Sequence, residues 1–300
     1  MAPHRIRIGI NPLTWTNDDM PELGAETPLA TCLREAKEAG YDGIELGNKF
    51  PRRSEVLGPL LESHGLRLVS GWYSSALLER SVEAEIAAIQ AHLSLLRALG
   101  CDVLILCETT GAIHGDRTAP LSKRPRLSEA GWRTLTRGLT HLGNDLARQG
   151  VRLAYHHHMG TWVQTEEEID RLMAETGPNV HLLLDTGHLT FAGGRPAVMA
   201  ARHARRIAHV HAKDVRPAVL ADALARDLPF LQAVLNGVFT VPGDGSVDYH
   251  AVFGALTRVP YRGWLVVEAE QDPKKAHPAT FARMGFRNVA ALMRCAGLVE

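Results

Sequence analysis

The 300-residue sequence has few cysteines, no excess of charge of either sign and no long hydrophobic run. Its four cysteines form no CxxC pair and no dense framework, which fits reduced thiols in a cytosolic protein rather than a disulfide scaffold. Lys and Arg total 33, and so do Asp and Glu. Proteins that follow phosphate backbones normally carry a clear positive excess, so we expect no nucleic acid partner.

Signals for a membrane or for export are also missing. No run approaches the ~20 apolar residues that span a bilayer, and no basic start precedes an apolar stretch long enough for a signal peptide. We therefore expect a cytoplasmic protein without a membrane partner. The sequence contains no P-loop, no dinucleotide-binding pattern and no GxSxG elbow, so these motifs support neither nucleotide binding nor serine nucleophilic catalysis.

The sequence does contain an alternation of strand-like and helix-like segments, which is typical of an α/β fold with a parallel sheet. Strands are expected at residues 5–11, 43–47, 66–72, 103–108, 151–158, 180–185, 207–213 and 264–270. Helices are expected at 28–39, 53–64, 81–99, 129–149, 165–175 and 278–296. This pattern predicts one (β/α)8 TIM barrel domain over residues 1–300, because the fold typically takes roughly 250 residues.

Two long connections follow predicted strands, at residues 109–127 and 215–249. The first carries His114, Asp116 and Arg117, and the second carries the run Val-Pro-Gly-Asp-Gly at 241–245. Long loops at the strand ends of a barrel often form lids or substrate walls. We expect both connections to border a site.

Four of the predicted strands, all in the second half of the chain, end on residues that bind metals or move protons. The runs are VRLAYHHH at 151–158, VHLLLDTGH at 180–188, IAHVHAKD at 207–214 and WLVVEAE at 264–270. In such barrels the chemistry lies at the carboxyl ends of the strands. The four endings together therefore predict an enzyme with a divalent metal.

Alternation along a strand decides which of these side chains share a face. The sets expected to do so are His156 with His158 but not His157, His209 with His211 and Lys213, and Glu268 with Glu270. Asp185, His211 and Glu268 then supply carboxylate and imidazole ligands, which suit Mn²⁺, Co²⁺, Fe²⁺ or Zn²⁺ better than Ca²⁺ or Mg²⁺. For the fourth ligand, His156 is the first choice and His158 the second.

Each of these residues also has an ordinary structural interpretation. A strand histidine can be a hydrogen-bonded core residue, and Asp185 before Thr-Gly can cap the helix that follows. Glu268 can form an ion pair with a lysine or arginine. The metal site is favoured because all of these residues occur together at strand ends.

Other residues near strand ends are expected to contact the substrate. They are Glu45, Asn48, Lys213, Glu270, Trp15 and Trp72, and His188 lies close enough to Asp185 to reach the substrate as well. Lys213 can hold a hydroxyl or stabilise an oxyanion, or simply face solvent. An indole face suits the C–H side of a sugar-like ring, although ordinary packing is an equal alternative for the tryptophans.

Five segments carry a specific resemblance that runs over nearly the whole chain. They are Ile10-Asn-Pro-Leu-Thr-Trp-Thr-Asn-Asp-Asp19, Gly43-Ile-Glu-Leu-Gly-Asn-Lys-Phe-Pro51, Tyr155-His-His-His-Met-Gly-Thr161, Leu184-Asp-Thr-Gly-His-Leu-Thr-Phe-Ala-Gly193 and Val267-Glu-Ala-Glu-Gln-Asp-Pro273. They resemble the inosose dehydratases, enzymes of inositol breakdown in the xylose-isomerase-like superfamily of (β/α)8 barrels. The resemblance implies dehydration of 2-keto-myo-inositol (scyllo-inosose) to a trihydroxycyclohexane-dione. It also implies dependence on Mn²⁺ or Co²⁺ and an association with glutathione.

By position, Asp185, His211 and Glu268 match three ligands of the superfamily's metal site. The fourth ligand is a glutamate in the ketose epimerases of this superfamily, and His156 stands in its place. Because the epimerases use two metal-bound glutamates as an acid/base pair, the exchange argues against epimerisation and is compatible with a lyase.

For the elimination of water, the expected base is Glu268 or a histidine of the 156/158 pair. The expected acid is His188 or His158. The rival interpretation is a metal-dependent isomerase or epimerase of a ketose or keto-inositol, which also removes a proton but expels no water. A small polyol ketone is the expected partner, and a homo-oligomer is left open.

Overall fold

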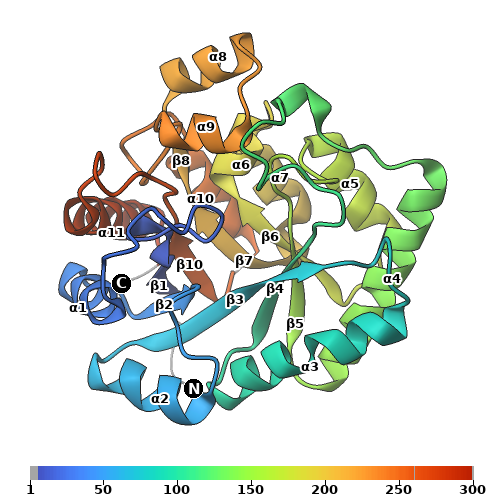
Figure 1. The fold of residues 1–300 in the computed structure, drawn as a ribbon, viewed down its shortest axis with the longest axis horizontal. Coiled ribbons are helices and arrows are strands. Elements are labelled where there is room, and N and C mark those ends of the chain that lie inside the picture. The colour runs from blue at the N-terminus through green and yellow to red at the C-terminus, as the bar shows by residue number, and fades with distance from the viewer. Residues whose placement is uncertain (1–5, 260, 299–300) are drawn as a thin grey trace.

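The computed structural model, which describes residues 6–259 and 261–298, is a closed barrel of parallel strands surrounded by helices (Figure 1). The strands are neighbours in the order β1-β10-β7-β6-β5-β4-β3-β2. Their bounds are Arg7–Ile10 (β1), Gly43–Leu46 (β2), Arg67–Ser75 (β3), Val103–Glu108 (β4), Arg152–His156 (β5), Val180–Asp185 (β6), Ile207–Ala212 (β7) and Trp264–Val267 (β10). The predicted barrel is confirmed, with a strand at each predicted place. Arg5, which begins the first predicted strand, lies outside the described residues.

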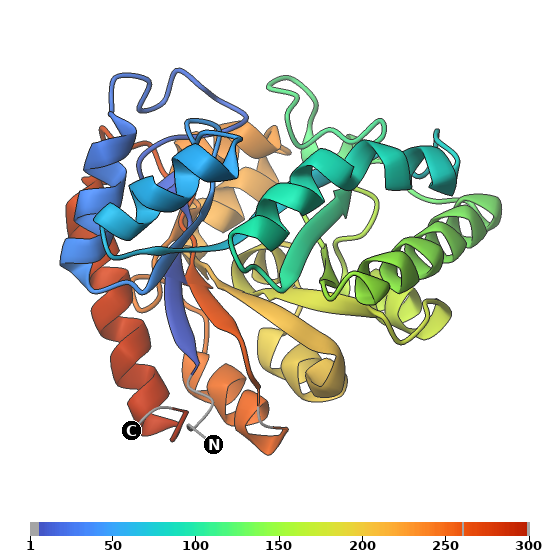
Figure 2. The ribbon, with the colours of Figure 1, turned by 90° about the horizontal axis from the view of Figure 1, so that it is seen from below.

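Helices lie around the barrel on its outer side (Figures 1 and 2). The predicted ones are present as α1 (Leu29–Ala39), α2 (Ser54–Ser63), α3 (Val82–Ala98), α4 (Glu129–Arg148), α5 (Glu166–Glu175) and α11 (Pro278–Cys295). The structure adds α7 (Pro196–His203) and α10 (Tyr249–Arg258), which the sequence pattern did not predict.

Helix α4 illustrates why these segments form surface helices. Leu135, Leu139, Leu142 and Leu146 recur every three or four positions, so they lie on one face and are fully buried. Each buried leucine stabilises the fold by about 2 kcal/mol relative to an exposed one. The helix begins where the Ser128 side chain accepts a hydrogen bond from the first turn.

The connection at residues 215–249, predicted as a long loop, is largely structured, so that prediction is wrong. It contains the helices α8 (Pro217–Ala225) and α9 (Phe230–Leu235), and its strand β9 (Phe239–Thr240) pairs antiparallel with β8 (Asp214–Val215). Phe230 and Phe239 pack with Phe191 of α6 (Thr186–Phe191) in a second apolar cluster. Helices of six to nine residues have too few turns to show a clear period in the sequence.

None of the helices within residues 6–259 and 261–298 combines the length and the apolar composition needed to cross a bilayer.

Candidate active site

Strand register brings the predicted metal ligands to one level of the barrel. Asp185 at the end of β6 lies directly opposite His211 on β7. His156 is the last residue of β5, the next strand on the other side of β6. Glu268 follows β10, which pairs with β7. The four side chains therefore meet at the carboxyl ends of neighbouring strands.

One atom of each of these residues points into a common space. His211 Nδ1 lies 2.9 Å from Glu268 Oε2 and 3.5 Å from Asp185 Oδ2. His156 Nε2 lies 3.3 Å from His211 Nδ1 and 3.5 Å from Asp185 Oδ2. All four atoms lie within 4.8 Å of one another. Two carboxylate oxygens and two imidazole nitrogens in this arrangement can hold a divalent metal ion.

The two carboxylates divide their oxygens between the protein and this four-ligand cluster. Asp185 Oδ1 accepts a hydrogen bond from the backbone N–H of His188 at 2.7 Å, whereas the fully buried Oδ2 has no hydrogen-bond partner among the described residues. Glu268 Oε1 lies 2.5 Å from Lys213 Nζ, whereas Oε2 faces His211. The two ordinary roles expected from the sequence are therefore both present, Asp185 as a helix cap and Glu268 in an ion pair. Each role leaves one carboxylate oxygen for the cluster. Because a buried polar atom without a partner costs about 1–3 kcal/mol, Asp185 Oδ2 fits a site for a cation.

The electrostatics of the cluster also suit a cation. Burial would raise the pKa of Asp185, but Lys213 together with the neighbouring histidines outweighs it and holds the pKa well below its ordinary value. Burial lowers the pKa of His156, so its ring is neutral and a nitrogen lone pair is free. Burial also disfavours a proton on His211, yet Glu268 and Glu45 raise its pKa well above the ordinary value. In the metal-free protein, the added proton on His211 supplies a positive charge to the cluster. A bound metal ion would supply this charge instead.

Lys213 is the centre of a second set of buried contacts. Its Nζ lies 2.9 Å from His188 Nε2 and 3.0 Å from Glu270 Oε2, in addition to the contact with Glu268. Burial disfavours its charge, but the surrounding carboxylates raise its pKa, so the ammonium stays charged. His158, His188 and Glu270 are close enough together to hold a metal, but this ammonium is bonded to two of them and repels a second cation.

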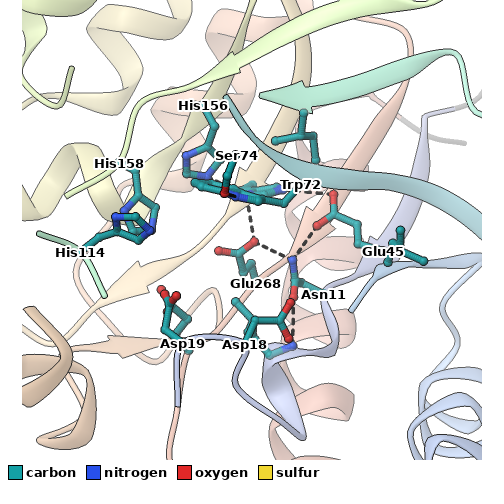
Figure 3. A pocket seen from close by; sticks show the side chains of 15 residues that line it. Asn11, Asp18, Asp19, Glu45, Trp72, Ser74, His114, His156, His158 and Glu268 are labelled. Carbon is teal, nitrogen blue, oxygen red and sulfur yellow. Dashed lines mark hydrogen bonds and ion pairs between the residues drawn. The ribbon is translucent and has the colours of Figure 1, made fainter. Parts of the chain in front are cut away.

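A cavity of about 220 Å³ opens onto the four-ligand cluster (Figure 3). The predicted site residues that line it are His156, His158, His211, Glu268, Glu45, Glu270 and Trp72. The Trp72 ring lies across the cavity with its centroid 5.3 Å from the His156 ring and 5.5 Å from the His158 ring. The cavity therefore has a floor of potential metal ligands and an aromatic wall.

Other predicted site residues lie outside the cavity lining. Asp185, Lys213 and His188 are fully buried behind it, and the His188 ring centroid lies 3.7 Å from that of His158. The Trp15 indole is buried elsewhere and donates to Glu35 at 2.7 Å.

Asn48, also predicted to contact substrate, is exposed and not part of the lining. Its side-chain amide donates to the carbonyl of Asn17 at 3.4 Å, so it connects two loops.

The cavity also has lining residues that the sequence did not predict as site residues. Asn11, Asp18 and Asp19 come from the segment after β1, Ser74 from the end of β3, and His114 from the connection at residues 109–127. The polar run Asn17-Asp18-Asp19 shortly after a strand end is the sequence feature from which Asp18 and Asp19 could have been predicted. These residues add carboxylates, an amide and an imidazole, which are groups that bind hydroxyls.

A closed parallel barrel with buried carboxylates and histidines at the carboxyl ends of its strands has the architecture of a TIM-barrel enzyme. The chain belongs to the xylose isomerase-like TIM barrel family, whose model matches residues 33–287.

Among similar proteins is the rhizopine catabolism protein MocC of Rhizobium meliloti, which is 53% identical over 97% of this chain and 90% of its own length. The inosose dehydratase of Geobacillus thermodenitrificans is 46% identical over 93% of this chain and 94% of its own length. The inosose dehydratase of Clostridium tetani is 43% identical over 93% of this chain and 94% of its own length. The predicted resemblance to inosose dehydratases is confirmed.

Solved structures share the fold at low sequence identity. An L-ribulose 3-epimerase superimposes with a TM-score of 0.68 at 17% identity, covering 97% of this chain and 96% of its own. The probable 3-DHS dehydratase AsbF of Bacillus anthracis gives a TM-score of 0.70 at 14% identity, covering 95% and 99%. At these identities the likeness shows the barrel alone.

Proposed function

We propose that the protein is a hydro-lyase that removes water from scyllo-inosose and gives a trihydroxycyclohexane-dione, as inosose dehydratases do. The observation that carries this proposal is the near-full-length identity of 46% to an inosose dehydratase. The cavity supports it, because its floor of ligands and its wall of hydroxyl-binding groups and an indole suit a polyol ketone.

We propose Asp185, His211, Glu268 and His156 as the ligands of a divalent metal, with Mn²⁺ or Co²⁺ as the ion. The proposal is supported by the unpartnered Asp185 Oδ2 and by the mixed oxygen and nitrogen donor set. A divalent ion bound there would act as a Lewis acid that makes the proton beside the ketone more acidic. His158, the second choice for the fourth ligand, lies outside this four-atom set and lines the cavity.

Proton removal from the carbon beside the ketone is assigned to Glu268 or His158, both of which face the cavity. Burial lowers the pKa of His158 well below its ordinary value, so its ring is neutral and carries no imidazolium proton to donate. Burial likewise lowers the pKa of His188, which lies behind the cavity wall and is supported less well as the acid.

Glu270 is the better candidate for the proton that leaves with the hydroxyl as water. It lines the cavity, and burial raises its pKa to about 7, against the opposing charge of Lys213. A carboxyl with this pKa is protonated part of the time near neutral pH and can donate. The bond from carbon to hydroxyl then breaks as the double bond forms, which balances the elimination.

The proposal is tested by incubating the protein with scyllo-inosose and added Mn²⁺ or Co²⁺ and measuring the mass of the product. A product lighter by one water supports a dehydratase. A product of unchanged mass supports the isomerase or epimerase alternative, and no turnover with any divalent ion contradicts both. Parallel reactions with and without added glutathione test whether this cofactor, proposed from the family resemblance, is required.

The identity of 53% to a rhizopine catabolism protein favours a second candidate, in which the same site acts in the breakdown of rhizopine. A comparison of kcat/KM for scyllo-inosose and for rhizopine distinguishes the two candidates. A clear preference for rhizopine would replace inosose as the substrate while leaving the proposed metal site in place.

A further inference from the structure

Glu45, predicted from the sequence as a substrate-binding residue, has both carboxylate oxygens bonded to protein. Its Oε1 lies 2.8 Å from His209 Nε2 and 3.1 Å from His211 Nε2. Its Oε2 accepts a hydrogen bond from Asn11 Nδ2 at 2.6 Å. These contacts use three of the about four acceptor positions of a carboxylate. Glu45 therefore has little capacity left for a substrate hydroxyl.

The His211 ring bridges Glu45 and the four-ligand cluster. Its Nε2 faces Glu45, and its Nδ1 faces Glu268 and Asp185. When Nε2–H is donated to Glu45, the lone pair of Nδ1 points to the place where a metal would bind. Metal-binding histidines almost always donate their other ring N–H to a carboxylate, a carbonyl or water, which fixes the orientation of the ring.

Asn11 connects Glu45 to the cluster from the other side (Figure 3). Its Oδ1 accepts a hydrogen bond from the backbone N–H of Leu13 at 2.9 Å, so the amide cannot be reversed without losing this bond. Its Nδ2 consequently donates hydrogen bonds to Glu45 Oε2 at 2.6 Å and to Glu268 Oε2 at 2.9 Å. One amide thus holds the ligand Glu268 and the carboxylate Glu45 in a fixed relation.

We infer that Glu45 is a positioning residue for the metal site: with Asn11 and His209 it orients His211 so that Nδ1 is the ligating atom. This inference rests on the proposed metal site and assigns Glu45 a role in metal affinity rather than in substrate contact. His209, which is fully buried beside Glu45, supplies a second donor to the same oxygen.

The direct test is calorimetric titration of the metal-free protein with Mn²⁺, for the wild type and for Glu45→Gln. A glutamine has one acceptor oxygen, and its NH₂ group meets either the donor of Asn11 or the donors of the histidines. Because loss of such an outer carboxylate typically costs 10–100-fold in metal affinity, we expect the Kd for Mn²⁺ to rise by about this factor. The KM of the substrate at saturating Mn²⁺ should stay unchanged.

The matched control is Glu108→Gln. Glu108 is also a buried carboxylate at the carboxyl end of a barrel strand, but its Oε2 accepts from Ser75 Oγ at 2.6 Å and from the Leu77 N–H at 2.7 Å, and its Oε1 accepts from the Thr110 N–H at 3.0 Å. It belongs to none of the groups of potential metal ligands. This variant should therefore keep the Kd of the wild type for Mn²⁺.

The outcomes separate this inference from the proposed metal site. If the wild type binds no Mn²⁺, the metal site itself is contradicted. If the wild type binds Mn²⁺ and Glu45→Gln binds it equally well, only the positioning role is overturned. A raised KM with an unchanged Kd for Mn²⁺ would return Glu45 to substrate binding.

A second measurement uses the wild-type protein and does not depend on the folding of a variant. Long-range ¹H–¹⁵N spectra of the Zn²⁺-loaded protein distinguish the two ring nitrogens of each histidine. We expect the His211 signals to show a protonated Nε2 and a metal-bound Nδ1. Signals of a metal-bound Nε2 would overturn the inference.

Discussion

At the scale of single residues, the candidate site depends on how each polar side chain divides its atoms. Asp185 caps α6 with one oxygen and leaves the other without a hydrogen-bond partner among the described residues, and Glu268 pairs with Lys213 through one oxygen only. His211 faces Glu45 with one nitrogen and the cluster with the other. A structural role and a chemical role therefore coexist in the same residue, and finding the first does not argue against the second.

His156→Ala should weaken metal binding, whereas His158→Ala should lower turnover without changing metal binding. His156 Nε2 is one of the four clustered atoms, so its loss should weaken Mn²⁺ binding by at least about tenfold. His158 lines the cavity outside this set, so its loss should leave the Kd for Mn²⁺ unchanged and lower kcat by about 10²–10⁴-fold. Calorimetry and steady-state kinetics measure the two effects.

The control for both variants is His181→Ala, at the start of β6 and outside the cavity lining, which should change neither quantity. Loss of Mn²⁺ binding in His158→Ala, with binding retained in His156→Ala, would make His158 the fourth ligand instead.

Part of this site could be predicted from the sequence, because side chains alternate along a strand. That rule set His156, His211 and Glu268 on inward faces at strand ends without any knowledge of the fold's details. The role of Asn11 could not be predicted in this way. Its contact with Glu268 joins residues 257 positions apart and depends on closure of the barrel between β1 and β10.

At the scale of elements, the strands and the longest helices were predictable, whereas helices of fewer than ten residues were not. The strands are apolar runs such as Val103–Glu108, buried on both faces, and the long helices show several turns of periodic leucines. By contrast, α6, α8 and α9 have six to nine residues each, and tertiary packing of their apolar side chains determines them. Two of the three occupy the connection that was predicted as a loop.

Helix α6 illustrates how a short element positions the site. It begins directly after Asp185, and its Gly187 packs against the side chain of Lys213. A Cβ at position 187 would lie within 2.8 Å of three carbon atoms of Lys213. Gly187→Ala should therefore displace Lys213 from Glu268 and Glu270, lower the free energy of unfolding by about 1–3 kcal/mol and reduce kcat. Urea denaturation and kinetics measure these changes.

The control is Gly254→Ala in α10, where an added Cβ meets no heavy atom within 4 Å. It should stabilise the protein by about 0.5–1 kcal/mol, because alanine is the better helix former. Full activity and wild-type stability of Gly187→Ala would contradict this prediction. They would show that α6 does not fix the position of the Lys213 side chain beside Glu268 and Glu270.

At the scale of the whole molecule, the site exists only in the closed barrel. Its residues come from β2, β5, β6 and β7 and from the segments that follow β1 and β10. The contact of Glu45 with His211 alone joins residues 166 positions apart. An unfolded chain cannot hold these atoms together, so a metal that binds here binds the folded state and stabilises it.

We therefore expect Mn²⁺ at a free concentration of 100 times its Kd to raise the free energy of unfolding by about 2.7 kcal/mol, and EDTA to reverse the increase. The increase should be small in Glu268→Gln, which lacks one charged ligand. The effect should depend on pH, because His156 and His211 bind a metal only through unprotonated nitrogens. Since the pKa of His211 is raised in the metal-free protein, protons compete with the metal above the ordinary histidine pKa of about 6.5. At one fixed free Mn²⁺ concentration, the Mn²⁺-dependent increase should therefore grow as the pH rises through this range, and equal increases at about pH 6 and about pH 8 would contradict histidine ligation.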